Sequence, residues 1–143
     1  MPSDFRLKAT NMAHRALLKI SFGKLGNEIQ GMPSIELTTT GRKSGRPHAV
    51  MLTAPIVDGD TYIIVASRGG DPAHPAWFLN LRDNPDVAVS VQSGPQVPMT
   101  ARVATAQERA TLWPRVATAQ PIYGEYQTKT EREIPLVLLT RKN

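Results

Sequence analysis

Short apolar or alternating segments, most of them bounded by glycine, proline, asparagine or aspartate, recur along this chain from residue 34 onward. Alternating and β-branched segments with such boundaries are typical of strands. The predicted strands are 34–40, 48–57 (with Pro55 at an edge or bend), 61–67, 86–92, 98–106 and 134–140. Because few helical segments separate them, the pattern predicts a mainly antiparallel β fold with a few helices (α+β), forming a small barrel or curled sheet.

Helical periodicity is confined to a few segments. Apolar residues recur at helical spacing in residues 5–22, with most basic residues elsewhere on the surface, which predicts a helix. This helix either lies across the sheet or rests as a basic amphipathic helix on a membrane surface. A short helix is predicted over about 75–82, with proline at its first position, and another over 107–118, with Pro114 as an interruption. Residues 121–128 are predicted as a loop or a short helix.

The composition limits the classes of protein that this chain can join. Its 143 residues predict one domain, residues 1–143, and its apolar runs are too short to cross a bilayer. The absence of cysteine excludes disulfides, thiol catalysis and thiolate metal sites, and fits a cytoplasmic protein. A net charge of +5 predicts attraction to polyanions such as nucleic acid, anionic lipid or a phosphorylated cofactor. Nucleic acid is the least supported partner, because most cations are dispersed and no recognised binding motif is present.

One predicted turn is strongly basic. The stretch Thr38–His48 joins the first two predicted strands and carries Arg42, Lys43 and Arg46. Its glycines permit positive φ and close approach of a ligand, and successive turn amides can form an anion nest. Arginine adds a planar fork that suits phosphate or carboxylate. Residues 41–46, named here the basic turn, are therefore either an anion-binding site or an ordinary solvated hairpin turn.

Two further segments carry elements of a ligand site. Ala66–Gly70 repeats the combination of a hydroxyl, a cation and glycines at the end of a predicted central strand. In His74–Asn80, Trp77 precedes Asn80 by three residues on the predicted helix and either flanks a planar ligand or fills the core. If the basic turn and Ala66–Gly70 open at the same end of the sheet, they form one anion-binding mouth.

No side-chain constellation for catalysis is evident. The G-x-S-x-G motif of hydrolases and the spacing of a phosphate-binding P-loop are absent. His14, His48 and His74 lack the spacing of metal ligands, so no metal site is predicted. If the chain is an enzyme, a bound cofactor is expected to supply the chemistry.

Three stretches together resemble the deazaflavin-dependent nitroreductase family, small reductases that use coenzyme F420. They are Leu37–Pro47 (LTTTGRKSGRP), Val65–Val87 (VASRGGDPAHPAWFLNLRDNPDV) and Ile134–Arg141 (IPLVLLTR). The resemblance implies a split β-barrel like that of FMN-binding oxidoreductases. It also implies hydride transfer from reduced F420 to a small organic acceptor: a quinone, a nitro compound or an activated alkene.

The resemblance further implies a cofactor site, residue by residue. The phosphate and acidic tail would be held by Arg42, Lys43 and Ser44. The cofactor would run along the following strand, past His48, Ala49, Val50, Met51, Leu52 and Thr53. The deazaflavin ring and ribityl chain would face Val65, Ala66, Ser67 and Arg68, and the opposite wall would be Ala76, Trp77, Phe78, Leu79 and Asn80. Tyr123, also counted among the cofactor contacts, and Tyr126 would border the substrate pocket. Independently of the resemblance, the proton for the acceptor is expected to come from Ser67, a tyrosine such as Tyr126, or water, which makes Ser67 and Tyr126 the candidate catalytic residues.

The sequence departs from the family pattern at three of these places. His48 stands where relatives often carry arginine, Arg68 where lysine is common, and Gln120 where a nitroimidazole-reducing relative has tyrosine. Alternatives on the same fold are an FMN- or haem-type split-barrel protein and a non-catalytic F420-binding module. The family includes quinone reducers at membranes, so the segment 5–22 leaves peripheral membrane contact open.

Overall fold

The computed structural model describes residues 28–29 and 32–142, so the helix predicted over 5–22 lies outside the described residues. The described strands are β1 (Glu28–Ile29), β2 (Met32–Thr40), β3 (Pro47–Thr53), β4 (Ile56–Asp58), β5 (Thr61–Val65), β6 (Asp86–Val91), β7 (Gln96–Val103) and β8 (Leu136–Arg141). The described helices are α2 (Ala76–Asp83), α3 (Ala106–Ala119) and α4 (Pro121–Thr128), with a 3-10 turn η1 (Arg68–Gly70) after β5.

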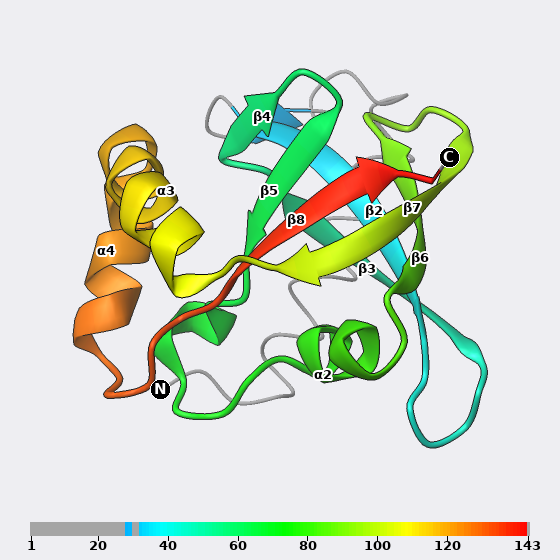
Figure 1. Ribbon diagram of the computed structural model, residues 1–143, viewed down its shortest axis with the longest axis horizontal. Helices are drawn as coiled ribbons and strands as arrows, with labels where there is room; N and C mark the ends of the chain where they lie inside the picture. The colour runs from blue at the N-terminus through cyan, green and yellow to red at the C-terminus, as the bar shows by residue number, and fades with distance from the viewer. Residues whose placement is uncertain (1–27, 30–31, 143) are drawn as a thin grey trace.

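All of these strands join one antiparallel sheet. The order is β1-β2-β6-β7-β8-β5-β4, and β3 pairs with the other edge of β2. At the centre of β2, Ile35 lies opposite Leu52 of β3 and Val91 of β6. The sheet curls, so that β5, β7 and β8 lie in front of β2 and β3 in Figure 1. The prediction of a mainly antiparallel, curled sheet with few helices is confirmed.

The apolar segment predicted as one strand over 48–57 is divided into two. β3 ends at Thr53, and β4 begins at Ile56 after Ala54 and Pro55. Proline has no N–H for the ladder, which explains the break at this point. β3 pairs with β2, whereas β4 pairs with β5, so the chain passes here from one part of the curled sheet to another.

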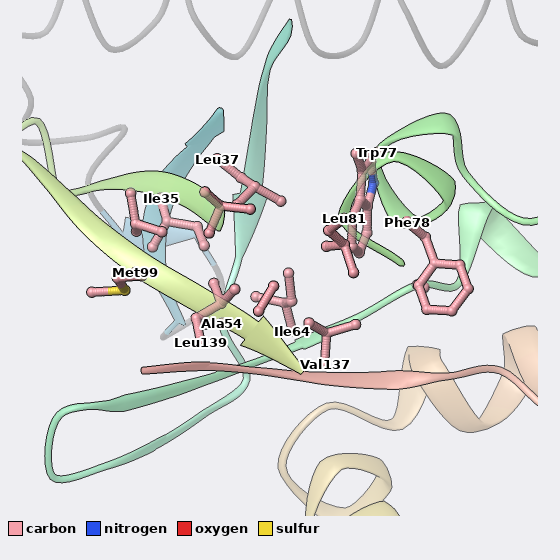
Figure 2. Close-up of a cluster of buried hydrophobic side chains, with 14 residues drawn as sticks. Ile35, Leu37, Ala54, Ile64, Trp77, Phe78, Leu81, Met99, Val137 and Leu139 are labelled. Atoms are coloured by element: carbon pink, nitrogen blue, oxygen red, sulfur yellow. The ribbon is translucent and has the colours of Figure 1, made fainter. Parts of the chain in front are cut away.

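Strands β5 and β8 are buried on both faces. Ile64 and Ala66 belong to a cluster under α2, whereas Ile63 and Val65 belong to a second cluster with α3 and α4. Successive side chains of a strand point to opposite faces of the sheet, so the even-numbered and the odd-numbered residues of β5 each pack into a hydrophobic cluster. Figure 2 shows Trp77 and Leu81 of α2 beside Ile64 and strand side chains of the first cluster. This double burial explains why β5 reads as an uninterrupted apolar run rather than an alternating one.

The helices differ from their predictions in detail. Residues 121–128 form the helix α4, and Pro75 is the N-cap of α2 rather than its first helical residue. Helix α3 starts with a capping box between Thr105 and Glu108, and it continues through Pro114 without interruption. The predicted interruption at Pro114 is wrong. Pro114 has no N–H to donate to the Ala110 carbonyl, but both residues lie on the exposed side of α3, where water can hydrogen-bond that carbonyl. In the described part of the chain no helix is long and apolar enough to cross a membrane.

Replacing Pro114 with alanine tests whether α3 is continuous. In a continuous helix, Pro114→Ala restores a hydrogen bond and is expected to raise the free energy of unfolding by about 1–3 kcal/mol, measured by urea denaturation. The matched control is Pro121→Ala at the start of α4, where proline is favourable and its loss should slightly destabilise the protein. A fall in stability for Pro114→Ala would mean that the chain bends at this residue.

Candidate functional site

The basic turn is closed by hydrogen bonds of its own backbone. The Gly41 amide donates to the Arg46 carbonyl at 2.8 Å, and the Gly45 amide donates to the Gly41 carbonyl at 2.9 Å. The Arg46 amide donates to Ser44 Oγ at 3.1 Å. These amides are engaged inside the turn, so cationic side chains, rather than a nest of these amides, are the groups that it offers to an anion.

Gly41 is buried beneath the side chains of Ser44, in the basic turn, and His48, in β3. Ser44 Oγ lies 3.4 Å from His48 Nε2. A Cβ added to Gly41 would lie 2.6 Å from Ser44 Oγ and 2.7 Å from His48 Nε2. Only glycine leaves this Ser44–His48 contact undisturbed, which ties the shape of the basic turn to residue 41.

Helix α2 anchors the basic turn through Asn80. Asn80 is 5% exposed, and its Oδ1 accepts hydrogen bonds from the Arg42 amide at 3.2 Å and from Arg42 Nη1 at 2.8 Å. Its Nδ2 donates to Thr39 Oγ1 at 3.2 Å. The side chains of Arg42, Lys43 and Arg46 are exposed, and none joins a salt bridge with another described residue. The basic turn therefore presents cations whose charge no described carboxylate neutralises.

The segment after β5 has a strained backbone. Arg68, Gly69 and Gly70 have φ values of 46°, 64° and 84°. A positive φ is unfavourable for arginine and persists only where surrounding contacts fix it. A Cβ on Gly70 would lie 2.8 Å from the Tyr126 carbonyl oxygen, so this turn packs closely against α4. Ser67 is 8% exposed, and its hydroxyl makes no hydrogen bond to another described residue.

Arg132 holds this segment from the other side, and sequence reasoning missed it. Its Nε donates to the Asp71 carbonyl at 2.9 Å, and its two terminal nitrogens donate to the carbonyls of Ala66 at 3.2 Å and Ser67 at 2.8 Å. Nη1 also lies 3.1 Å from His74 Nδ1. The sequence shows Arg132 only as a cation between two exposed glutamates, and its backbone acceptors leave no side-chain signature.

The aromatic residues proposed for the walls of the site lie mostly in the core. Trp77 is 9% and Phe78 3% exposed, and both belong to the cluster under α2, whereas Ala76 is exposed and Leu79 half-buried. The Tyr123 hydroxyl lies 3.2 Å from Thr53 Oγ1, and burial raises the pKa of that hydroxyl above its ordinary value. Tyr126 is half-buried and packs edge-on against Tyr123.

The structure brings the two turns to the same end of the sheet. In Figure 1, the loop between β2 and β3 and the η1 turn lie at the lower end of the molecule, with α2 between them. Residues 71–75 connect η1 to α2, and Asn80 of α2 holds Arg42. Among residues 28–29 and 32–142, no group of His, Cys, Asp and Glu side chains is arranged to hold a metal ion.

The curled, mainly antiparallel sheet with few helices places this chain in the split β-barrel class. The fold is shared with a protein of the pyridoxine phosphate oxidase family from Clostridium acetobutylicum, related to general stress protein 26 of B. subtilis. That structure has a TM-score of 0.55 and 11% identity, covering 90% of this chain and 84% of the other. The predicted split-barrel architecture is confirmed.

Nearer relatives identify the family within this class. The model of the F420H(2)-dependent quinone reductase family matches residues 11–141. An F420H(2)-dependent quinone reductase of Mycobacterium tuberculosis is 42% identical, covering 90% of this chain and 88% of the relative. A solved F420-H2 dependent reductase (FDR-A) is 42% identical with a TM-score of 0.65, covering 75% and 93%. The chain therefore belongs to the F420H(2)-dependent quinone reductase family, and the resemblance to small F420-dependent reductases is confirmed.

His74 makes the stability of this region dependent on pH. Burial, followed by the charges of Arg132 and Arg82, lowers the pKa of His74 below its ordinary value of 6.5. The unfolded chain therefore takes up a proton more readily than the folded protein, so the free energy of unfolding falls as pH drops through 6.5 and levels off below the folded pKa.

A single histidine variant tests this effect. His74→Gln keeps an acceptor for Arg132 and is expected to flatten the pH dependence of stability between about pH 7.5 and 5.5, measured by urea denaturation. If His74→Gln and the parent protein have the same slope, His74 is not the titrating group.

Proposed function

We propose that this protein transfers a hydride from reduced coenzyme F420 to a quinone-type acceptor. The observation that supports this most is the basic turn, whose three exposed cations have no salt bridges among the described residues and which α2 holds in place through Asn80. Family membership supplies the cofactor class.

The side chains present fit the chemistry of F420. This coenzyme carries a phosphodiester and a carboxylate-rich tail, and guanidinium and ammonium groups are the usual protein ligands for both. Arg42 and Lys43 would bind the phosphate and tail, and Ser44 would add a hydroxyl. Because Asn80 fixes the Arg42 guanidinium, less side-chain entropy is lost on binding.

The other proposed cofactor contacts come from β3, from the segment after β5 and from α2, near the end of the sheet where both turns lie. The strand β3 would line the cofactor with residues 48–53, and Val65, Ala66, Ser67 and Arg68 would face its ring and ribityl chain. On α2, the exposed Ala76 and half-buried Leu79 are the residues most accessible to a ligand. Trp77, Phe78 and Asn80 would support that wall from within, since their side chains are buried.

When bound, reduced F420 supplies a two-electron hydride, so the protein needs to orient the reactants and exclude water. A quinone is the acceptor class that the family name supports, and nitro compounds and activated alkenes extend the same chemistry. The Ser67 hydroxyl, which has no described hydrogen-bond partner, is free to donate to an acceptor oxygen. Tyr126 and Tyr123 would border the acceptor.

Double replacement of Arg42 and Lys43 tests the anchor. Arg42→Ala/Lys43→Ala is expected to raise the Kd for F420 by about tenfold or more, measured by fluorescence titration at low salt. The control is Arg141→Ala/Lys142→Ala, which removes the same charge at the end of β8 and should change the Kd little. Equal effects of both pairs would show that net charge, and not the basic turn, binds the tail.

The same titration separates the proposed function from its alternatives. Absence of F420 binding by the parent protein would overturn the proposal, and a yellow or red protein as purified would favour FMN or haem. Binding without turnover of quinones, nitro compounds or activated alkenes would favour a non-catalytic F420-binding module.

Single substitutions test the two proposed proton donors. Ser67→Ala is expected to lower kcat for a quinone by about 10²-fold with little change in the Kd for F420, since general acid catalysis contributes on this order. Tyr126→Phe keeps the ring that would border the acceptor and removes only the hydroxyl, so a similar fall in kcat with little change in KM is expected only if Tyr126 donates the proton. Unchanged steady-state kinetics for Ser67→Ala would assign the proton to Tyr126 or to water.

A further inference from the structure

One guanidinium group closes the segment after β5. Arg132 Nε, Nη1 and Nη2 donate to the carbonyls of Asp71, Ala66 and Ser67 at 2.9, 3.2 and 2.8 Å. His74 Nδ1 lies 3.1 Å from Nη1. These acceptors lie on both sides of η1, so this one side chain links the start and the end of the turn, in addition to the ion pair between Arg68 and Asp71 at 3.1 Å.

The enclosed turn needs such support. Arg68 has a φ of 46°, and the two glycines that follow also have positive φ. Within the turn, the Gly70 amide donates to the Ser67 carbonyl, the Asp71 amide donates to the Arg68 carbonyl, and Arg68 Nη1 donates to Asp71 Oδ1 at 3.1 Å. A residue other than glycine keeps a positive φ only where surrounding contacts hold its backbone in place. The planar guanidinium of Arg132 supplies such contacts to the backbone on both sides of Arg68.

We propose that Arg132 is a positioning residue for hydride transfer: its guanidinium fixes residues 66–71, and with them the Ser67 hydroxyl and the Arg68 side chain, in the geometry that receives the deazaflavin. This inference rests on the proposed function, because Ser67 and Arg68 belong to the proposed cofactor wall. Arg132 acts through the backbone of these residues and needs no contact with cofactor or substrate.

Arg132→Lys is the decisive variant, since it keeps the charge and removes the planar fork. A lysine ammonium cannot donate to carbonyls on both sides of η1 with the same geometry. The Kd for F420 is expected to rise and kcat for a quinone to fall, each by about tenfold or more, because small displacements of reacting groups have effects of this size. The titration uses full-length protein whose folded state is verified by circular dichroism.

Arg109→Lys is the matched control. Arg109 is also partly buried and also binds a backbone carbonyl, that of Ile134 at 3.0 Å, together with Gln127 Oε1 at 3.0 Å. Arg109 lies on α3 and hydrogen-bonds none of residues 66–71; its link to Arg132 runs through Gln127, whose Nε2 donates to the Arg132 carbonyl at 2.7 Å. Arg109→Lys should lower the midpoint of thermal unfolding while the folded protein keeps its Kd and kcat.

A milder pair of variants serves if Arg132→Lys does not fold. His74→Phe keeps the ring contact with Phe78 but removes the acceptor for Arg132 Nη1, whereas His74→Gln retains an acceptor. His74→Phe should raise the Kd for F420 by about threefold and His74→Gln should leave it unchanged, since one hydrogen bond is lost in the first case only.

The outcomes separate this inference from the proposed function. If the parent protein does not bind F420, the proposed function and this inference both fail. If it binds and Arg132→Lys binds and turns over equally well, Arg132 is a structural residue only and the proposed function stands. Equal losses in Arg132→Lys and Arg109→Lys would likewise overturn the positioning role, since they would report general loosening of the fold.

Discussion

The burial of β5 and β8 between two hydrophobic clusters is the constraint on which the rest of the structure depends. Residues of one parity face the cluster under α2, and residues of the other parity face α3 and α4. A shift of β5 by one residue would exchange the two faces, so its register is strongly specified. This fixed strand sets the position of Ser67 and of the strained turn that follows it.

Polar contacts of buried or half-buried side chains then hold the two turns at the end of the sheet. Asn80 connects α2 to the basic turn, and Arg132 connects the approach to β8 with residues 66–71. Both side chains bind backbone groups as well as side chains. A rigid support of this kind suits a reaction in which the protein mainly orients a bound cofactor and its acceptor.

Much of the fold was predictable, because the periodicity of apolar residues and the turn residues report local structure directly. The strands of residues 34–40, 61–67 and 86–92 and the helix near 75–82 followed from these signals. The continuity of α3 through Pro114 did not follow from these signals. Local propensity disfavours proline inside a helix, whereas the packing of Leu112 and Val116 in the core favours the helical conformation of this segment. The basic turn was identifiable from its composition, whereas Arg132 was not, because its partners are mainly carbonyls that any residue provides.

The sequence by itself determined the kind of protein: an antiparallel β fold, a concentration of cations at one turn, and three stretches that mark the family. Those features are local, and each can be read from neighbouring residues. Only the tertiary structure decided that Trp77 lies in the core, that Asn80 holds Arg42, and that Arg132 closes the turn after β5. The last two are contacts between residues 38 to 66 positions apart in the chain, and they exist only once the curled sheet has brought its ends together.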